Sequence, residues 1–74
     1  MDLRALMSFV TVCRLGNITR AAEALYISQP ALTRQIQELE QELGCQLLVR
    51  STRSLSLTEN GYLFMLRAQE ILDL

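Results

Sequence analysis

The chain has 74 residues, half of them apolar and a fifth charged, with a net charge of −1 at pH 7. This length predicts one small domain with a packed core, and no apolar run approaches the ~20 residues of a membrane span. We therefore expect a cytoplasmic protein that makes no contact with membranes. There is no histidine, and Cys13 and Cys45 form no C-x-x-C pair, so we expect no metal, no cofactor and no enzymatic activity. Both thiols are interpreted as buried and reduced.

The first third of the chain predicts two helices separated by a tight break. The first helix covers residues 3–15, with Asp2 as its N-cap and Gly16-Asn17 at its end. Thr19 is the predicted N-cap of a second, short helix over residues 20–25. Small alanine side chains in this second helix favour the close approach of another helix.

A third helix follows the short turn 26–28, with Ser28 as its N-cap and Pro30 in its first turn, where a missing N–H costs nothing. Gly44 ends this helix. Two helices joined by so short a turn predict a helix-turn-helix. The expected buried stripe consists of Leu32, Ile36, Leu39 and Leu43. The opposite face carries no acid and consists of Gln29, Pro30, Thr33, Arg34 and Gln37.

Two short strands are predicted next, over residues 47–50 and 55–58, and the second alternates with period two. The polar segment 51–54 between them completes a hairpin, a wing beside the helix-turn-helix. We therefore predict a mainly α fold: a winged helix-turn-helix with a three-helix core, a two-stranded wing and a long C-terminal linker helix. Residues 1–58 form the domain, and residues 59–74 begin the linker helix.

The fourth helix begins after Thr58, its predicted N-cap, and Gly61 near its start permits a close backbone contact. No stop signal precedes residue 74, so we expect a fragment of a longer protein. The helix is apolar on more sides than one core requires. We expect the same helix of a second chain to cover the extra surface in a two-fold dimer. The predicted dimer contacts are Tyr62, Leu63, Leu66 and Ile71. In the alternative, a missing C-terminal domain covers this face.

Charges are unevenly distributed along the chain. Residues 19–37 and 45–58 carry four arginines and one glutamate, whereas residues 38–44 carry three glutamates and no base. The four arginines are Arg20, Arg34, Arg50 and Arg53. A DNA duplex would attract the front of the third helix and the wing, as in docking by a recognition helix. Arginine also suits phosphate and the guanine edge, and the glutamine and threonine side chains can read base edges. Glu38, Glu40 and Glu42 are interpreted as a solvated face.

Specific motifs run through nearly the whole chain. They are Ala21-Ala22, Ser28-Gln29-Pro30-Ala31-Leu32-Thr33, Gln35-Ile36, Leu39-Glu40, Leu43-Gly44, Leu47, Arg50, Arg53, Leu57-Thr58 and Gly61. In these motifs the chain closely resembles the N-terminal domain of LysR-type transcriptional regulators. The resemblance implies a sequence-specific bacterial DNA-binding domain, with residues 28–44 in the major groove of promoter DNA and the wing, 47–58, on the minor groove or backbone. It also implies a C-terminal sensor domain, absent from this chain, that binds a small-molecule inducer.

The residues and the resemblance together give one set of predicted DNA contacts. It consists of Thr19, Arg20, Ser28, Gln29, Pro30, Thr33, Arg34, Gln37, Arg50 and Arg53. Two alternatives remain open. One is a winged-helix protein-interaction module with weak or no DNA binding, favoured by the acidic total and the absence of lysine. The other is a redox-sensing regulator that switches through Cys13 or Cys45.

Overall fold

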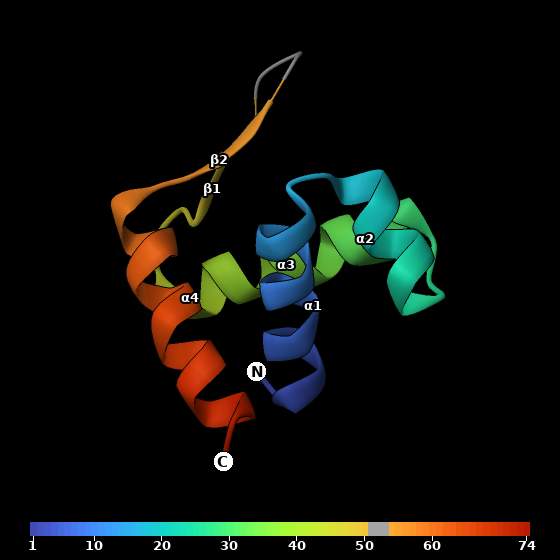
Figure 1. Cartoon of the computed structure of the whole chain (residues 1–74). Helices are drawn as coiled ribbons and strands as arrows, with labels where there is room; N and C mark the ends of the chain where they lie inside the picture. Colours follow the sequence, from blue (N-terminus) through green and yellow to red (C-terminus); the bar gives the residue numbers. More distant parts are fainter. Residues whose placement is uncertain (51–53) are drawn as a thin grey trace.

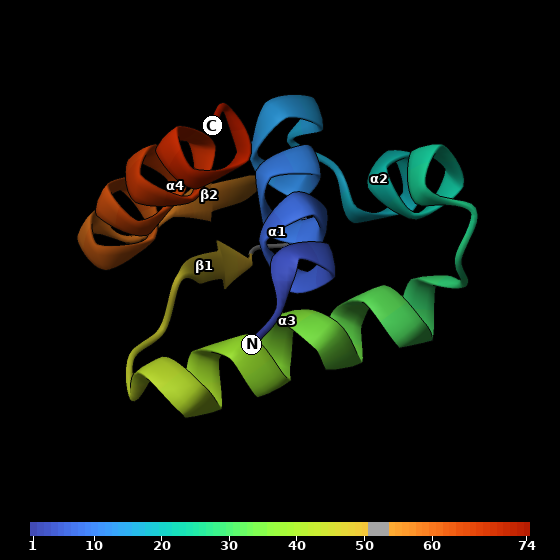
Figure 2. The ribbon, with the colours of Figure 1, turned by 90° about the horizontal axis from the view of Figure 1, so that it is seen from below.

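A computed structural model describes residues 1–50 and 54–74 of the chain. In chain order its elements are α1 (Leu3–Leu15), α2 (Ile18–Leu25), α3 (Gln29–Leu43), β1 (Leu48–Arg50), β2 (Leu55–Leu57) and α4 (Glu59–Leu72). Figures 1 and 2 show α2 and α4 on opposite sides of α1, with α3 crossing α1 and the hairpin extending away from the helices. The predicted mainly α, winged helix-turn-helix architecture is confirmed.

The ends of α1 follow the sequence prediction, whereas the start of α2 does not. Asp2 accepts a hydrogen bond from the Ala5 N–H at 2.9 Å, and Gly16 ends α1 in the left-handed conformation. Asn17, not Thr19, is the N-cap of α2, and its Oδ1 accepts from the Arg20 N–H at 2.9 Å. The prediction was wrong because the chain is already extended directly after Gly16, which places an asparagine, an even better cap than threonine, at the first capping position.

The turn between α2 and α3 reverses the chain without a glycine. Tyr26 adopts the left-handed conformation with φ 59°, and the Ile27 N–H donates to the Ala22 carbonyl at 3.1 Å. Ser28 then caps α3, as predicted, by accepting from the Ala31 N–H at 3.2 Å. Gly44 ends α3 with φ 70°. Both ends of α3 are therefore fixed by contacts within a few residues along the chain.

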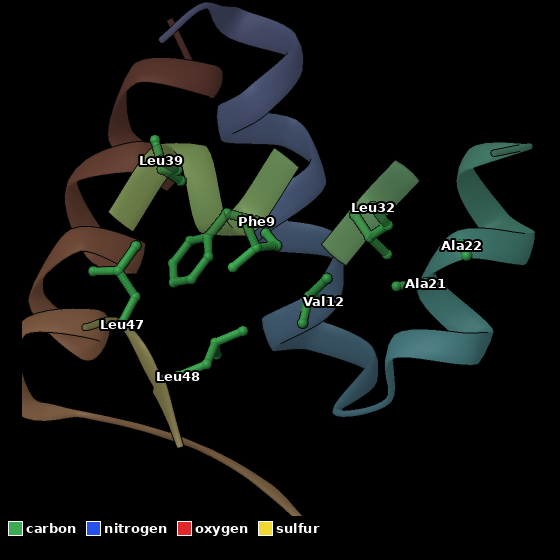
Figure 3. Packing of buried hydrophobic residues seen from close by; sticks show 9 residues of the cluster. Phe9, Val12, Ala21, Ala22, Leu32, Leu39, Leu47 and Leu48 are labelled. Atoms are coloured by element: carbon green, nitrogen blue, oxygen red, sulfur yellow. The ribbon is translucent and has the colours of Figure 1, made fainter. Parts of the chain in front are cut away.

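One hydrophobic cluster joins all three helices of the core to the start of the wing (Figure 3). Its buried members are Phe9, Val12, Ala21, Ala22, Leu32, Ile36, Leu39, Leu47 and Leu48. Burial of each large apolar side chain contributes about 1.5–3 kcal/mol to stability. Leu43, predicted in the same stripe, is 36 % exposed instead. It is the last residue of α3, beyond the part of the helix whose leucine and isoleucine side chains belong to the core cluster.

The wing is a two-stranded antiparallel hairpin in which Leu48 pairs with Leu57 and Arg50 with Leu55. Each strand is one residue shorter than predicted. Leu47 lies directly before β1: its N–H donates to Glu40 of α3, and its carbonyl accepts from the N–H of Thr58, the residue directly after β2. Of the predicted connecting segment, residues 51–53 lie outside the described residues.

The start of α4 is joined closely to the chain before β1. Thr58 Oγ1 accepts from the Gly61 N–H at 2.9 Å and donates to the Gln46 carbonyl at 2.6 Å. A Cβ atom on Gly61 would lie only 2.0 Å from the Leu47 carbonyl oxygen, which confirms the predicted close backbone contact. Along its length α4 packs on α1, and the Phe9 and Phe64 rings lie 5.4 Å apart. Among the residues described, no helix has the length and apolar character that crossing a membrane requires.

Candidate nucleic-acid interface

The N-terminal half of α3 presents a polar face without acidic residues. Ser28, Gln29, Pro30, Arg34 and Gln37 are exposed, as predicted for a contact surface. The sixth predicted contact on this helix, Thr33, is half-buried. Because Leu32, Ile36 and Leu39 are turned into the core, Arg34 and Gln37 are held outward. Gln29 shares the helical spacing of Leu32 and Ile36 but is exposed at the first residue of α3.

The second helix adds two predicted contacts at the same end of α3. Thr19 and Arg20 are both exposed in the first turn of α2. Gln29 Nε2 donates a hydrogen bond to Thr19 Oγ1, which joins the first turns of α2 and α3 through their side chains. The structure thus brings together two predicted contacts that are ten residues apart in the sequence.

The wing adjoins the other part of this face. Arg50 is exposed at the end of β1. A hollow of about 280 Å³ lies between α3 and the wing, and both Gln37 and Arg50 line it. The remaining lining residues are Ile36, Glu40, Gln46 and Leu48. Arg53, the second predicted wing contact, lies outside the described residues.

Glu40 is a structural residue that the sequence interpretation placed wrongly on a solvated face. Its Oε2 accepts hydrogen bonds from the Leu47 N–H at 2.7 Å and the Leu48 N–H at 3.2 Å. The side chain is half-buried between α3 and β1. Its partners lie seven and eight residues later, so no i,i+3 or i,i+4 rule of helix pairing could find them. The sequence signals were its place beside the buried Leu39 and its membership of the Leu39-Glu40 motif.

Glu42, near the end of α3, has a partner other than the predicted contact arginines. Glu42 forms an ion pair with the N-terminal ammonium group at 2.7 Å, and this hydrogen bond raises the pKa of the ammonium group. The other ion pair within residues 1–50 and 54–74 joins Arg67 Nη1 to Glu70 at 2.6 Å. Neither involves Arg20, Arg34 or Arg50, so the positive charge of these arginines is not neutralised within the described part of the chain.

The predicted dimer contacts lie on a part of α4 that this chain does not cover. Tyr62 is 55 % exposed, Leu63 52 %, Leu66 41 % and Ile71 46 %. Ala68, roughly opposite Leu63 and Leu66 around the helix, is fully buried against Leu6 and Val10 of α1, whereas Ile71 lies about one turn after Ala68 on nearly the same side. One side of α4 thus belongs to the core and another leaves large apolar side chains exposed, which is the arrangement that the sequence predicted.

Cys13 is half-buried, and burial raises the pKa of its thiol to about 11. The thiolate, which is the reactive form, is therefore scarce at neutral pH. Cys45 is also half-buried and free. No group of three potential metal ligands occurs within the part of the chain that the structure describes.

Two helices joined by a short turn, with an exposed polar face on the second and a hairpin beside it, define a winged helix-turn-helix domain. Residues 3–62 match the family described as "Bacterial regulatory helix-turn-helix protein, lysR family". The chain belongs to this family, as the resemblance in its motifs predicted.

Curated relatives agree with this assignment. The SDS degradation transcriptional activation protein of a Pseudomonas species is 51 % identical over 72 residues, which cover 97 % of this chain and 24 % of that protein. The HTH-type transcriptional regulator BudR of Raoultella terrigena is 53 % identical over 74 residues, all of this chain and 26 % of BudR. The chain therefore spans about a quarter of the length of these relatives.

Solved structures show the same fold. The CbnR_DBD–DNA complex has a TM-score of 0.94 and 45 % identity, with 99 % of this chain and 84 % of that chain covered. The BenM_DBD/catB site 1 DNA complex has a TM-score of 0.95 and 46 % identity, with 99 % and 81 % covered. Both are complexes with DNA, so this fold is seen bound to DNA in two similar proteins.

Proposed function

We propose that this chain is the sequence-specific DNA-binding domain of a bacterial LysR-type transcriptional regulator. In this proposal α3 lies in the major groove of promoter DNA, and the wing lies on the adjacent minor groove or backbone. The observation that carries the proposal is the exposed, acid-free front of α3, adjoined by Arg50 of the wing. The CbnR and BenM domains, solved with DNA, support it.

The dimensions and the charges of this surface suit a duplex. With 15 residues, α3 is about 22 Å long, and a single helix fits the major groove. The net charge of −1 is unevenly distributed: Glu40 is turned toward the Leu47 and Leu48 N–H groups and Glu42 pairs with the N-terminus, whereas the front of α3 carries no acid. The attraction to phosphate depends on the positive charge at the front of α3 and on the wing rather than on the net charge of the chain.

The predicted contacts divide into two roles. Gln29, Thr33 and Gln37 recur at four-residue spacing and would read base edges through their donors and acceptors. The arginines would bind phosphate or guanine, and those of the wing would bind the backbone or enter the minor groove. The arginines are Arg20 and Arg34 on the helices and Arg50 and Arg53 in the wing. Ser28 and Pro30 would bring the first turn of α3 close to the backbone.

The parent protein, in this proposal, is a cytoplasmic regulator and not an enzyme, as its curated relatives are transcriptional regulators. Residues 1–58 form the DNA-binding unit, and residues 59–74 begin a linker helix. This helix pairs with its copy in a homodimer through Tyr62, Leu63, Leu66 and Ile71, which leave large apolar surface exposed. A C-terminal domain beyond this chain would bind the small-molecule inducer.

Fluorescence polarisation with a pool of random duplexes, at two salt concentrations, tests the proposal. We expect binding that weakens steeply with salt, because phosphate contacts release counterions. Arg34→Ala should reduce the slope of log affinity against log salt by about one unit. Arg67→Ala is the matched control, since it removes the same charge from an ion pair on α4. Absence of binding to any duplex by the folded chain would instead support the protein-interaction module.

Selection of a preferred duplex from the same pool then tests sequence specificity. Gln29→Ala should weaken binding to the selected duplex by about tenfold and binding to random duplexes much less, because base contacts discriminate and phosphate contacts do not. Arg53→Ala should weaken binding to both duplexes alike. Equal losses on both duplexes for Gln29→Ala would mean that α3 presents a different reading residue.

A further inference from the structure

Thr19 and Gln29 form a side-chain link between the two helices of the helix-turn-helix. Gln29 Nε2 donates to Thr19 Oγ1, and both residues are exposed on the proposed DNA-binding face. The two backbones that carry them are each fixed by an N-cap, Asn17 for α2 and Ser28 for α3. The link therefore joins two anchored helix starts rather than two mobile loops.

This hydrogen bond restricts a side chain that would otherwise sample many rotamers. An exposed glutamine has three rotatable bonds and loses much conformational entropy when it binds a base. Threonine, in contrast, is β-branched and has few χ1 rotamers in a helix, so it is a stiff anchor. Thr19 thus pre-organises the Gln29 amide before any DNA is bound, which lowers the cost of binding.

The link also decides what the amide can offer to a base. A glutamine amide has one acceptor oxygen and two N–H donors. With one N–H donated to Thr19 Oγ1, the Oε1 acceptor and one N–H remain. An acceptor beside a donor complements adenine in the major groove, which presents its N6–H donor beside its N7 acceptor.

We propose that Thr19 is a positioning residue that orients Gln29 to read one adenine in the major groove. It sets specificity at that base pair through Gln29, without a base contact of its own. This inference rests on the proposed function and differs from the direct DNA contact that the sequence predicted for Thr19.

The test begins with selection of a preferred duplex by the 74-residue chain. Polarisation titrations then compare this duplex with versions in which each A·T pair is replaced by G·C. We expect one A·T pair whose replacement weakens binding of the wild-type chain by about tenfold, as for a good bidentate contact. Thr19→Val, which keeps the shape and removes the acceptor, should reduce that discrimination to about threefold or less. Thr19→Ser, which restores a hydroxyl, should retain most of it.

A double-mutant cycle completes the experiment. The double variant Thr19→Val with Gln29→Ala should distinguish the A·T duplex from the G·C duplex as well as Gln29→Ala alone does. Thr19 acts through Gln29, so its substitution has no further effect once Gln29 is removed. Arg20→Ala is the matched control on α2 and should weaken all duplexes alike. Circular dichroism melting should show that Thr19→Val is folded, as expected for an exposed residue.

Three results would overturn the inference. A wild-type chain that binds no duplex would overturn it together with the proposed function. A wild-type chain that binds DNA but shows no A·T pair of this kind would overturn the inference alone. The same holds if Thr19→Val keeps the wild-type ratio of affinities between the A·T and G·C duplexes, because Thr19 would then not act through Gln29. A loss of affinity that is equal on every duplex would show that Thr19 only contacts phosphate.

Discussion

The recognition helix and the wing lie on one proposed DNA surface but are held by different kinds of interaction. The ends of α3 are fixed by neighbours along the chain, as in the Ser28 cap, which accepts from an N–H three residues later. The wing is fixed by partners from distant segments. Glu40 reaches Leu47 and Leu48 from seven and eight residues away, and Thr58 reaches Gln46 from twelve.

All of these distant contacts converge on the short segment 46–48, directly before and at the start of β1. Glu40 of α3 binds its N–H groups, while Thr58 and Gly61 contact its carbonyl groups from the start of α4. The orientation of the wing relative to α3 therefore depends on a few polar and steric contacts at one place. We expect substitutions there to disturb the wing first, and substitutions at the helix caps to act locally.

Gly61→Ala is expected to have the largest effect. The new Cβ would lie 2.0 Å from the Leu47 carbonyl oxygen, and since that atom belongs to the backbone, either α4 or β1 must move. We expect a loss of about 3 kcal/mol in the free energy of unfolding, measured by urea denaturation, together with faster proteolysis in the wing.

Gly44→Ala is the matched control for this substitution. Gly44 has φ 70°, but no atom lies within 4 Å of the position of a Cβ, so only backbone strain is added. We expect a cost of about 1 kcal/mol. Equal costs for the two alanine variants would mean that the contact between α4 and Leu47 relaxes easily, and that the wing is not fixed there.

Glu40→Ala should have the next largest effect, about 2 kcal/mol, because two backbone N–H groups lose a charged acceptor. Native-state hydrogen exchange provides the sharper measurement. The Leu47 and Leu48 amides should exchange faster in the variant, whereas the Ala31 amide, bonded to Ser28, should not. Glu38→Ala, at an exposed position of the same helix, should change neither. Faster exchange throughout α3 would contradict the separation between helix and wing.

The difference between contacts within a few residues and contacts with distant segments also explains which features could be predicted from the sequence. Asp2, Ser28 and Thr58 were predicted as N-caps because a cap and the N–H that it binds are only three residues apart. The exposed front of α3 followed from the apolar spacing of Leu32, Ile36 and Leu39 in the same way. Asn17 was missed as the N-cap of α2 because Asn17 and Thr19 are both good N-cap residues. The pattern of apolar residues in α2 does not show which of the two precedes the first helical residue.

Features that depend on distant segments could not be derived from local patterns. The partners of Glu40 become visible only when the chain after Gly44 folds back along α3. The Thr19–Gln29 hydrogen bond depends on the angle between α2 and α3. The short turn in the sequence predicts that these two helices are adjacent, but it does not predict this angle. Leu43 has the spacing of a buried residue, but helical periodicity does not reveal where the core of a small domain ends.

Ser28→Ala and Thr58→Ala form a matched pair that compares a local cap with one that also binds a distant segment. The Ser28 hydroxyl accepts from the Ala31 N–H, and its removal should cost about 1 kcal/mol. The Thr58 hydroxyl both accepts from the Gly61 N–H and donates to the Gln46 carbonyl, so its removal should cost about 2 kcal/mol. Thermal and urea unfolding would measure both values. A larger cost for Ser28→Ala would reverse the comparison.

Tyr26→Gly is expected to have the smallest effect, and the opposite sign. Tyr26 holds the helix-turn-helix turn with φ 59°, a conformation that costs an L-residue about 1–2 kcal/mol, and its side chain is 95 % exposed, so little packing offsets that strain. Glycine removes the strain but adds about 0.5–1 kcal/mol of entropy to be lost on folding. The net expectation is a gain of up to about 1 kcal/mol in urea unfolding.

Tyr26→Ala is the control for this last substitution, because it removes the aromatic ring and keeps the strained φ. We expect a change below about 0.5 kcal/mol, typical of an exposed position. If Tyr26→Gly destabilises the chain while Tyr26→Ala does not, the stiffness of the turn, rather than its strain, governs how α3 is held. If both destabilise it equally, the ring itself contributes to folding, and the start of α3 depends on more than its neighbours along the chain.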